Sequence, residues 1–147
     1  MDITDSVTRS RMMSAIKGKN TQPELVVRKA LHKKGLRFRL HVSGLPGKPD
    51  LVFHRHKAVV FVHGCFWHVH GCSNSKIPKT RTEFWTNKLE GNKARDEALV
   101  TVLQGNHWRV AIVWECSIRQ AEKSGDVRLF EHLANWITAS NANFAEF

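Results

Sequence analysis

The sequence predicts an α/β fold in which a mixed central β-sheet is flanked by helices. Two kinds of pattern lead to this prediction: amphipathic segments with helical spacing, and short segments rich in β-branched residues. They follow one another in the order α-β-β-β-α-β-α, and strands that alternate with helices favour a sheet covered on its faces. The chain has 147 residues, of which 41% are hydrophobic, enough for one domain with its own core.

The first predicted helix covers "TQPELVVRKALHKKG", residues 21–35. Thr21 and Glu24 fit a capping box, Pro23 suits a first turn and Gly35 suits a C-terminal stop. The following "RFRLHV", residues 37–42, alternates strictly between apolar and polar residues, which predicts a half-buried strand.

Later segments complete the pattern. "DLVF" and "AVVFV" are rich in β-branched residues and are separated by the polar "HRHK", which predicts a hairpin. Residues 80–105 have helical spacing, with a predicted break near Gly91. "WRVAIVW" (108–114) is apolar nearly throughout, as in a buried central strand, and "DVRLFEHLANWI" (126–137) predicts a final amphipathic helix.

The charge is strongly basic. The chain has 23 Lys and Arg against 13 Asp and Glu, a net charge of +10, and ten of these cations fall within residues 1–40. Such an excess favours a polyanionic partner, although a merely soluble basic protein is the alternative. We expect residues 1–20 to form a basic arm that contacts DNA and residues 21–147 to form a single domain.

Nothing in the sequence predicts a membrane segment. No apolar run approaches the eighteen residues that a span needs, and the N-terminus lacks the apolar region of a signal peptide. A cytoplasmic protein is therefore expected.

The cysteines suggest a metal site rather than disulfides. The chain has an odd number of them, namely Cys65, Cys72 and Cys116. Three thiolates and one imidazole would make a four-ligand zinc site. His70 lies two residues from Cys72, and His63 and His68 are the alternatives for the fourth ligand. Three separate buried thiols are the simpler interpretation.

Four further residues have the chemistry of a phosphodiesterase. Asp50 begins a strand after a Gly/Pro loop, where a carboxylate can hold Mg²⁺ near a phosphate. His63 and His68 follow the next strand and could transfer protons near neutral pH, and Asp96 could orient one of them. Alternatively, Asp50 is a turn residue and the histidines are ordinary core residues.

Two adjacent aromatic residues, Phe66 and Trp67, occur in the loop that carries these groups. They could act as an apolar wedge between DNA base steps, together with Trp85. Packing around a metal loop is the alternative.

Together, several motifs resemble the very-short-patch-repair (Vsr) mismatch endonucleases. These motifs are "TRSRMMSAIKGKNTQPE", "LPGKPDLVF", "VFVHGCFWHVHGC", "TRTEFW" and "WRVAIVWEC", and the resemblance runs from about Thr8 to about Trp136. It implies a restriction-endonuclease-like fold with a degenerate active site. "PD" is retained at Pro49-Asp50, while Phe61 and His63 stand where an acid and a lysine would be.

The resemblance implies an activity as well. Members nick one strand on the 5′ side of the T in a T·G mismatch, which arises when 5-methylcytosine deaminates. It implies Mg²⁺ held by Asp50 and by the backbone carbonyl of Val62, where a known member has Thr. It also implies His68 as general base with Asp96 as its partner, His63 as a phosphate-stabilising residue, and Glu24 acting through metal-bound water.

For the remaining residues the resemblance implies a structural zinc and a DNA interface. The zinc ligands would be Cys65, His70, Cys72 and Cys116. The DNA-contacting residues would be the aromatics Phe66, Trp67 and Trp85 and the cations of the arm, Arg9, Arg11, Lys17 and Lys19. We expect a nucleoid-associated bacterial monomer that acts on mismatched double-stranded DNA. Its sequence context is expected to be relaxed or altered, and a mismatch-repair protein is expected to stimulate it.

The sequence allows two other functions. A non-catalytic, zinc-stabilised DNA-binding module explains the charge, the aromatics and the cysteines, but leaves Asp50, His63, His68 and Asp96 without a role. A zinc hydrolase or deaminase is disfavoured, because four protein ligands leave no open position on zinc.

Overall fold

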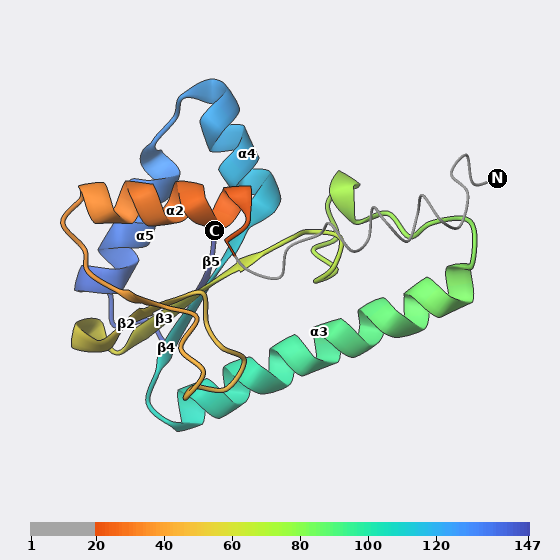
Figure 1. Ribbon diagram of the computed structural model, residues 1–147, viewed down its shortest axis with the longest axis horizontal. Coiled ribbons are helices and arrows are strands. Elements are labelled where there is room, and N and C mark those ends of the chain that lie inside the picture. Colours follow the sequence, from red (N-terminus) through yellow and green to blue (C-terminus); the bar gives the residue numbers. More distant parts are fainter. Residues whose placement is uncertain (1–19) are drawn as a thin grey trace.

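A computed structural model of the chain describes residues 20–147, so the predicted arm cations Arg9, Arg11, Lys17 and Lys19 lie outside the described residues. The predicted α/β class is confirmed: five strands form one mixed sheet with helices on both faces (Figure 1). The helices are α2 (Gln22–Lys33), α3 (Thr82–Gly105), α4 (Glu115–Ser124) and α5 (Arg128–Ala139), with short 3₁₀ turns η1 (His54–His56) and η2 (Ser73–Ser75). The strands are β1 (Arg39–Leu40), β2 (Leu51–Phe53), β3 (Ala58–His63), β4 (Arg109–Trp114) and β5 (Phe144–Glu146).

The strands lie in the order β1-β2-β3-β4-β5. The pairs β1–β2 and β2–β3 are antiparallel, as the predicted hairpin requires, while β3–β4 and β4–β5 are parallel. In the β3–β4 ladder His63 pairs with Trp114. Both strands therefore end at the same edge of the sheet, and the segments that follow them leave the sheet side by side.

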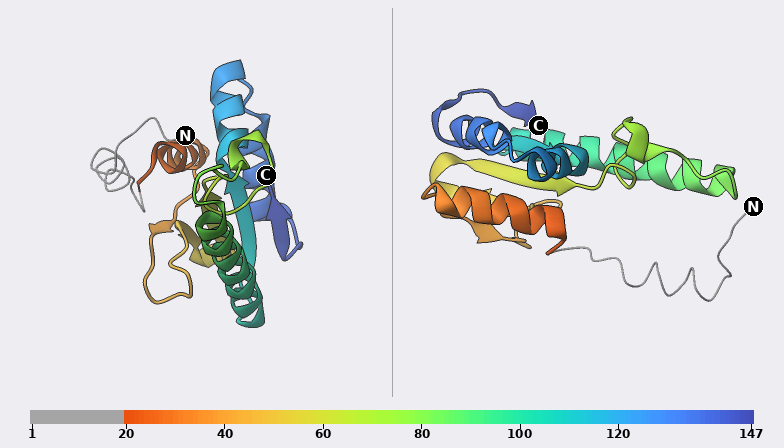
Figure 2. Two further views of the ribbon diagram at one scale, coloured as in Figure 1. Left: turned by 90° about the vertical axis from the view of Figure 1, so that its right-hand side faces the viewer. Right: turned by 90° about the horizontal axis from the view of Figure 1, so that it is seen from above.

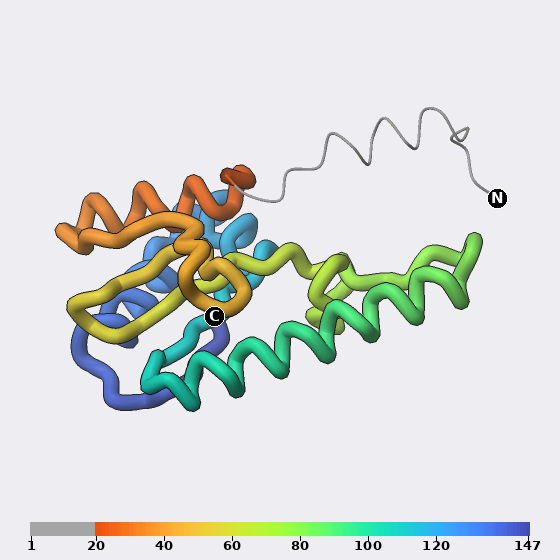
Figure 3. Tube along the Cα trace, turned by 60° about the horizontal axis from the view of Figure 1, so that its bottom comes forward, coloured from red at the N-terminus to blue at the C-terminus, as the bar shows by residue number. Residues whose placement is uncertain are grey.

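The two faces of the sheet are covered unequally. Helices α2, α4 and α5 pack on one face, and α3 packs on the other (Figure 1; Figure 2). The first face holds the larger apolar cluster, which includes Leu31, Phe53, Ile118 and Leu133. Helix α3 buries only Leu89 and Leu103, and its N-terminal half extends beyond the sheet beside the loop that follows β3 (Figure 3).

Helix α2 begins and ends as the sequence predicts. The side chain of Thr21 accepts a hydrogen bond from the Glu24 N–H, Pro23 lies in the first turn and Gly35 has a positive φ of 89° just beyond the end. Only the return bond of the capping box differs, because the Glu24 carboxylate accepts from the N–H of Asn20 rather than from that of Thr21.

The strand predicted over residues 37–42 is much shorter than expected. Only Arg39 and Leu40 pair with β2, because His41 has a left-handed backbone with φ of 47°, which ends the extended conformation. The predicted single apolar face is therefore wrong. Phe38 packs against the cluster below α2, and Val42 packs against the cluster on the opposite face.

Two further differences concern the second half of the chain. Helix α3 is continuous through Gly91, so the predicted break is wrong. Residues beyond Ser140 carry no clear pattern, yet residues 144–146 form β5, parallel to β4. Within residues 20–147, no helix has the length and apolar character needed to cross a membrane.

Candidate active site and metal centre

Asp50 lies immediately before β2, at the sheet edge where β3 ends. Antiparallel pairing brings it beside β3, and its Oδ2 accepts a hydrogen bond of 2.7 Å from the Val62 N–H. The pKa of Asp50 is raised to about 7, chiefly by burial and also by the nearby Glu24 carboxylate, although the hydrogen bond from the Val62 N–H acts in the opposite direction. A carboxylate with so little solvation binds a proton or a cation readily.

His68 and Asp96 form a hydrogen-bonded pair. The distance from His68 Nδ1 to Asp96 Oδ2 is 2.6 Å, and it joins the loop after β3 to helix α3. An ionised carboxylate can only accept, so Nδ1 carries the hydrogen, and the Nε2 of a neutral ring keeps its lone pair. This arrangement prepares His68 to take a proton from a water molecule.

His63 is the last residue of β3 and stacks on His68. Their ring centroids are 3.7 Å apart and the rings are inclined by only 6°. Burial, with the adjacent His68 ring, lowers the pKa of His63 to about 3. Its Nδ1 is buried and has no hydrogen-bond partner among the described residues. His63 is thus a neutral imidazole near pH 7, and it can serve as a hydrogen-bond donor without a positive charge.

One pocket of about 670 Å³ brings these groups together. Among the residues that line it are Asp50, His63, His68 and Asp96. Its volume is many times the ~30 Å³ that one water occupies, so a phosphate group and waters fit together. The carboxylate and the imidazoles, predicted to meet around one reacting group, therefore face one space.

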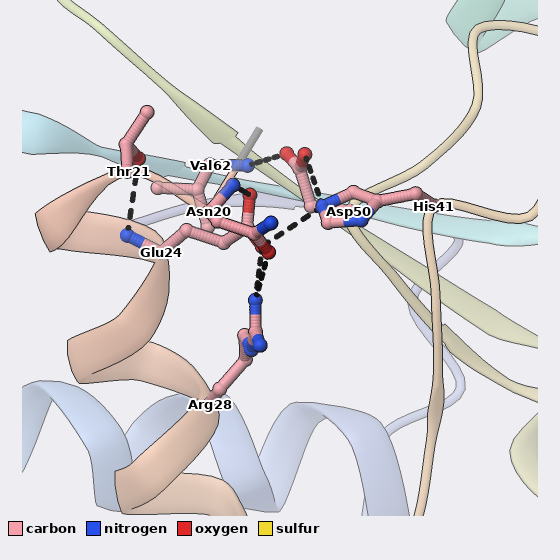
Figure 4. A network of polar contacts seen from close by, with 7 residues as sticks. All are labelled: Asn20, Thr21, Glu24, Arg28, His41, Asp50 and Val62. Carbon is pink, nitrogen blue, oxygen red and sulfur yellow. Dashed lines mark hydrogen bonds and ion pairs between the residues drawn. The ribbon is translucent and has the colours of Figure 1, made fainter. Parts of the chain in front are cut away.

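Glu24 reaches this pocket only indirectly. Its side chain is 2% exposed and is not among the described residues that line the pocket. Its carboxylate accepts hydrogen bonds from Asn20 N–H, Arg28 and His41, and His41 in turn lies beside Asp50 (Figure 4). Glu24, His41 and Asp50 form a group that could hold a cation.

A second group, on the other side of His68, has the composition of a metal centre. The ligand atoms of Cys65, His70, Cys72 and Cys116 all lie within 4.8 Å of one another. The parallel β3–β4 ladder explains the meeting, because Cys65 follows the end of β3 and Cys116 follows the end of β4. The two strand ends lie side by side, and His70 is the histidine in the group.

These residues fit a tetrahedral ion. Zinc–sulfur bonds of about 2.3 Å would place two thiolates about 3.8 Å apart, within the span of this cluster. Cys116 Sγ already lies 3.4 Å from His70 Nδ1, and the imidazole stacks on Trp114 with a centroid separation of 4.1 Å. Burial raises the pKa of Cys65 to about 12, whereas a hydrogen bond with Ser75 lowers that of Cys72 to about 6. A metal would replace the proton of Cys65.

The three predicted aromatic residues lie together. Phe66, Trp67 and Trp85 have ring centroids 5.0–5.9 Å apart, and Phe84 extends the group with its ring 5.3 Å from that of Trp85. We call these four residues the aromatic cluster. Asn92 of α3 donates to the carbonyl of Trp67 at 3.1 Å, which fixes the loop to the helix.

Sequence reasoning missed two members of these sites. Phe84 is 44% exposed, and its place beside Trp85 in "EFW" could have drawn attention to it. His41 was assigned to a regular strand, and no local signal indicated that its backbone turns toward Glu24.

An α/β fold with a half-buried carboxylate, a histidine–aspartate pair and a neutral histidine around one pocket has the groups that a hydrolytic enzyme uses. The profile of the family "DNA mismatch endonuclease Vsr" matches residues 1–74. The chain is 44% identical to the DNA mismatch endonuclease Vsr of Escherichia coli strain K12, over 97% of this chain and 91% of that protein. It is 47% identical to the type II nicking enzyme V.XorIIP of Xanthomonas oryzae pv. oryzae, over 79% of this chain and 88% of that protein.

The chain therefore belongs to the Vsr family of DNA mismatch endonucleases. Its predicted function as a DNA endonuclease that nicks mismatched DNA is confirmed at this level. The alternative of a non-catalytic binding module loses its support.

Proposed function

We propose that the protein hydrolyses the phosphodiester on the 5′ side of the T in a T·G mismatch, with Mg²⁺ at Asp50 and a structural zinc at the cysteines. The single observation that carries this proposal is the common pocket of Asp50, His63, His68 and Asp96. We further propose that the sheet and its helices are of the restriction-endonuclease-like type.

The proposed mechanism depends on a Mg²⁺ ion held by oxygen ligands. Asp50, with the backbone carbonyl of Val62 on the adjacent strand, would hold Mg²⁺, whose chemistry is to stabilise the negative charge that develops on the phosphate. The half-buried carboxylate supports this fit, since its raised pKa indicates that its charge is incompletely compensated. Oxygen ligands are those that Mg²⁺ prefers.

The chain's own residues would move the protons. His68, held by Asp96 through Nδ1, accepts a proton from the attacking water at Nε2. His63, neutral and stacked on His68, donates a hydrogen bond to the phosphate and limits the freedom of the His68 ring. Glu24 acts from behind this group, through His41 and water, rather than by direct contact with the substrate.

The remaining features would recognise the DNA. The aromatic cluster offers flat apolar surfaces beside the catalytic loop, and an aromatic wedge enters a weakly paired step at least cost. The net charge of +10 supports binding to the phosphate backbone. The arm cations Arg9, Arg11, Lys17 and Lys19 are proposed to contribute to that binding.

A cleavage assay on matched substrates tests the proposal. Zinc-loaded protein and Mg²⁺ should nick a T·G heteroduplex and leave the corresponding T·A duplex intact. Asp50→Ala should lower the nicking rate about a thousandfold, because loss of the main metal ligand removes several kcal/mol of transition-state stabilisation. Binding of the T·G duplex without Mg²⁺ should change little.

Two results would contradict this proposal. One is equal cutting of T·G and T·A duplexes, which would remove the mismatch from the mechanism. The other is an Asp50→Ala variant that nicks as fast as the original chain, which would move the catalytic metal elsewhere.

A further inference from the structure

His41 occupies an unusual position directly behind the proposed magnesium site. It follows β1 and has φ of 47°, a left-handed backbone that residues other than glycine adopt rarely. Its N–H donates to the carbonyl of Asp50 at 3.2 Å, so the backbone of His41 is fixed to that of Asp50. This turn directs the imidazole between α2 and the start of β2 (Figure 4).

The ring connects two carboxylates that arise from different elements. His41 Nε2 lies 2.9 Å from Glu24 Oε2 and 3.9 Å from Asp50 Oδ1. Because an ionised carboxylate only accepts, Nε2 carries the hydrogen and donates it to Glu24. Arg28 binds the same Glu24 oxygen at 2.8 Å, so the buried acid has donors on two sides.

His41 is also the residue through which Glu24 meets the pocket. The imidazole lines the pocket, whereas the Glu24 carboxylate is buried behind it. The ring is therefore the side chain that joins the Glu24 carboxylate to the wall of the pocket beside Asp50. A divalent cation that keeps several waters needs acceptors outside its first ligands, and their orientation sets its affinity.

We infer that His41 is a positioning residue, which holds Glu24 against Asp50 and so prepares the site for a hydrated divalent cation. The imidazole acts as a hydrogen-bond donor and not as a metal ligand, since Mg²⁺ strongly prefers oxygen. This inference rests on the proposed function, because it assumes that the cation binds at Asp50.

Three substitutions separate the possible roles of the ring. His41→Ala removes the donor. His41→Gln places an amide N–H close to the position of Nε2, whereas the shorter His41→Asn does not reach it. Asn tolerates a left-handed backbone well, so the Asn variant should fold even if the Ala variant does not. His32→Gln, at an exposed histidine near the end of α2, is the matched control.

Metal binding is measured directly, on full-length zinc-loaded protein. Mn²⁺ serves as the probe, because the electron paramagnetic resonance signal of the free ion reports how much is bound. His41→Ala and His41→Asn should raise the Mn²⁺ dissociation constant about tenfold or more, as is typical for loss of a partner behind a ligand. His41→Gln should stay close to the original chain, and His32→Gln should equal it.

Nicking of the T·G duplex gives the second readout. The Mg²⁺ concentration for half-maximal rate should rise in the Ala and Asn variants by a similar factor, with less change in the rate at saturation. Unchanged Mn²⁺ affinity in both variants would overturn the inference. So would a Gln variant that binds as weakly as the Ala variant, since this would make the imidazole a ligand.

Failure of the two proposals can be told apart. If the original chain binds Mn²⁺ but does not nick the T·G duplex, the proposed function fails while the Mn²⁺ comparison still decides the role of His41. If it nicks normally and the variants keep its Mn²⁺ affinity, only the role of His41 is wrong.

Discussion

His63 and His68 stack so closely that two protonated rings would repel each other strongly at this distance. The structure avoids this by burying His63, whose pKa is lowered to about 3. His68 has the solvent-facing position and the carboxylate partner. The different burial of the two imidazoles thus supports the two roles proposed for them: His63 would donate a hydrogen bond to the phosphate and His68 would accept a proton.

We predict that the His63 side chain stays neutral from pH 8 to pH 5. The unfolded chain would take up this proton near pH 6.5 and the folded protein only near pH 3, so acid between these values favours unfolding. Nuclear magnetic resonance of the histidine rings checks the prediction, with His63→Phe to assign the signal. A His63 signal that titrates with a midpoint above 6 would contradict it.

Helix α3 carries one residue proposed for DNA recognition, Trp85, and one proposed for catalysis, Asp96. It is 24 residues long, or about 36 Å at 1.5 Å per residue, yet it buries only two side chains. The aromatic Trp85 lies near its start, Asp96 past its middle and Leu99 against the Gly47 loop. Packing alone therefore contributes little to its outer half, and intrinsic helix propensity matters there.

Gly91 allows this to be tested. A Cβ at this position would meet no atom within 4 Å, and its φ is not positive. Gly91→Ala should stabilise the protein by about 0.5–1 kcal/mol, because glycine loses the most backbone entropy in a helix. The melting temperature, followed by circular dichroism, should rise by about 2–4 °C.

Gly47→Ala is the contrasting variant. Gly47 has φ of 76°, and a Cβ there would lie 2.9 Å from Leu99 Cδ1. This substitution should lower the melting temperature. If both alanine variants shift it in the same direction, the backbone argument for α3 is wrong.

The regular elements were predictable because each has a local cause. The cap at Thr21, the β-branched strands and the apolar "WRVAIVW" follow from rules that act over a few residues. Strand β5 escaped prediction because it is a three-residue edge strand, with an apolar Phe144 that stays 37% exposed. Its existence depends on pairing with β4, which no local pattern encodes.

The residue types of the site could be predicted from the sequence, but the backbone turns that bring them together could not. Residue types and strand ends indicated Asp50, the histidines and the cysteines. Val69, however, has a left-handed backbone with φ of 53°, which is disfavoured for a β-branched residue. This turn lets His68 reach Asp96 while His70 reaches Cys116. The spacing of His70 and Cys72 thus indicated the histidine of the cluster but not the backbone turn that places it. The left-handed backbone of His41 was likewise not predictable from the local sequence.

For the whole molecule, the loop between β3 and η2 belongs to both sites. It carries His68 toward the pocket and Cys65, His70 and Cys72 toward the metal group. Backbone hydrogen bonds within the loop run from the His68 N–H to the Gly64 carbonyl and from the His70 N–H to the Cys65 carbonyl, and a bound metal would add a further constraint on the loop.

We therefore predict that Cys116→Ser weakens both stability and nicking, although Cys116 lies outside the catalytic pocket. The variant should lose bound zinc, measured by atomic absorption, and its melting temperature should fall by about 10 °C, as several kcal/mol of metal-linked folding energy are lost. Nicking at saturating Mg²⁺ should fall because His68 is no longer held. Ser117→Ala, one residue further along α4, is the control. A Cys116→Ser variant with a normal melting temperature and a normal nicking rate would show that the metal group does not influence the pocket.

The hydrogen bond from Asn92 to the Trp67 carbonyl has a wider consequence. Asn92 lies one helical turn before Asp96. Helix α3 therefore holds both the loop with Trp67, proposed to probe the base stack, and Asp96, proposed to orient the general base. A weakly paired duplex that admits the aromatic residues would let α3 hold His68 in line with the scissile phosphate. A well-paired duplex that excludes them would displace α3 and with it His68. Mismatched and matched DNA would then be distinguished in the cleavage step as well as in binding. A matched duplex could be bound tightly and still not be cut.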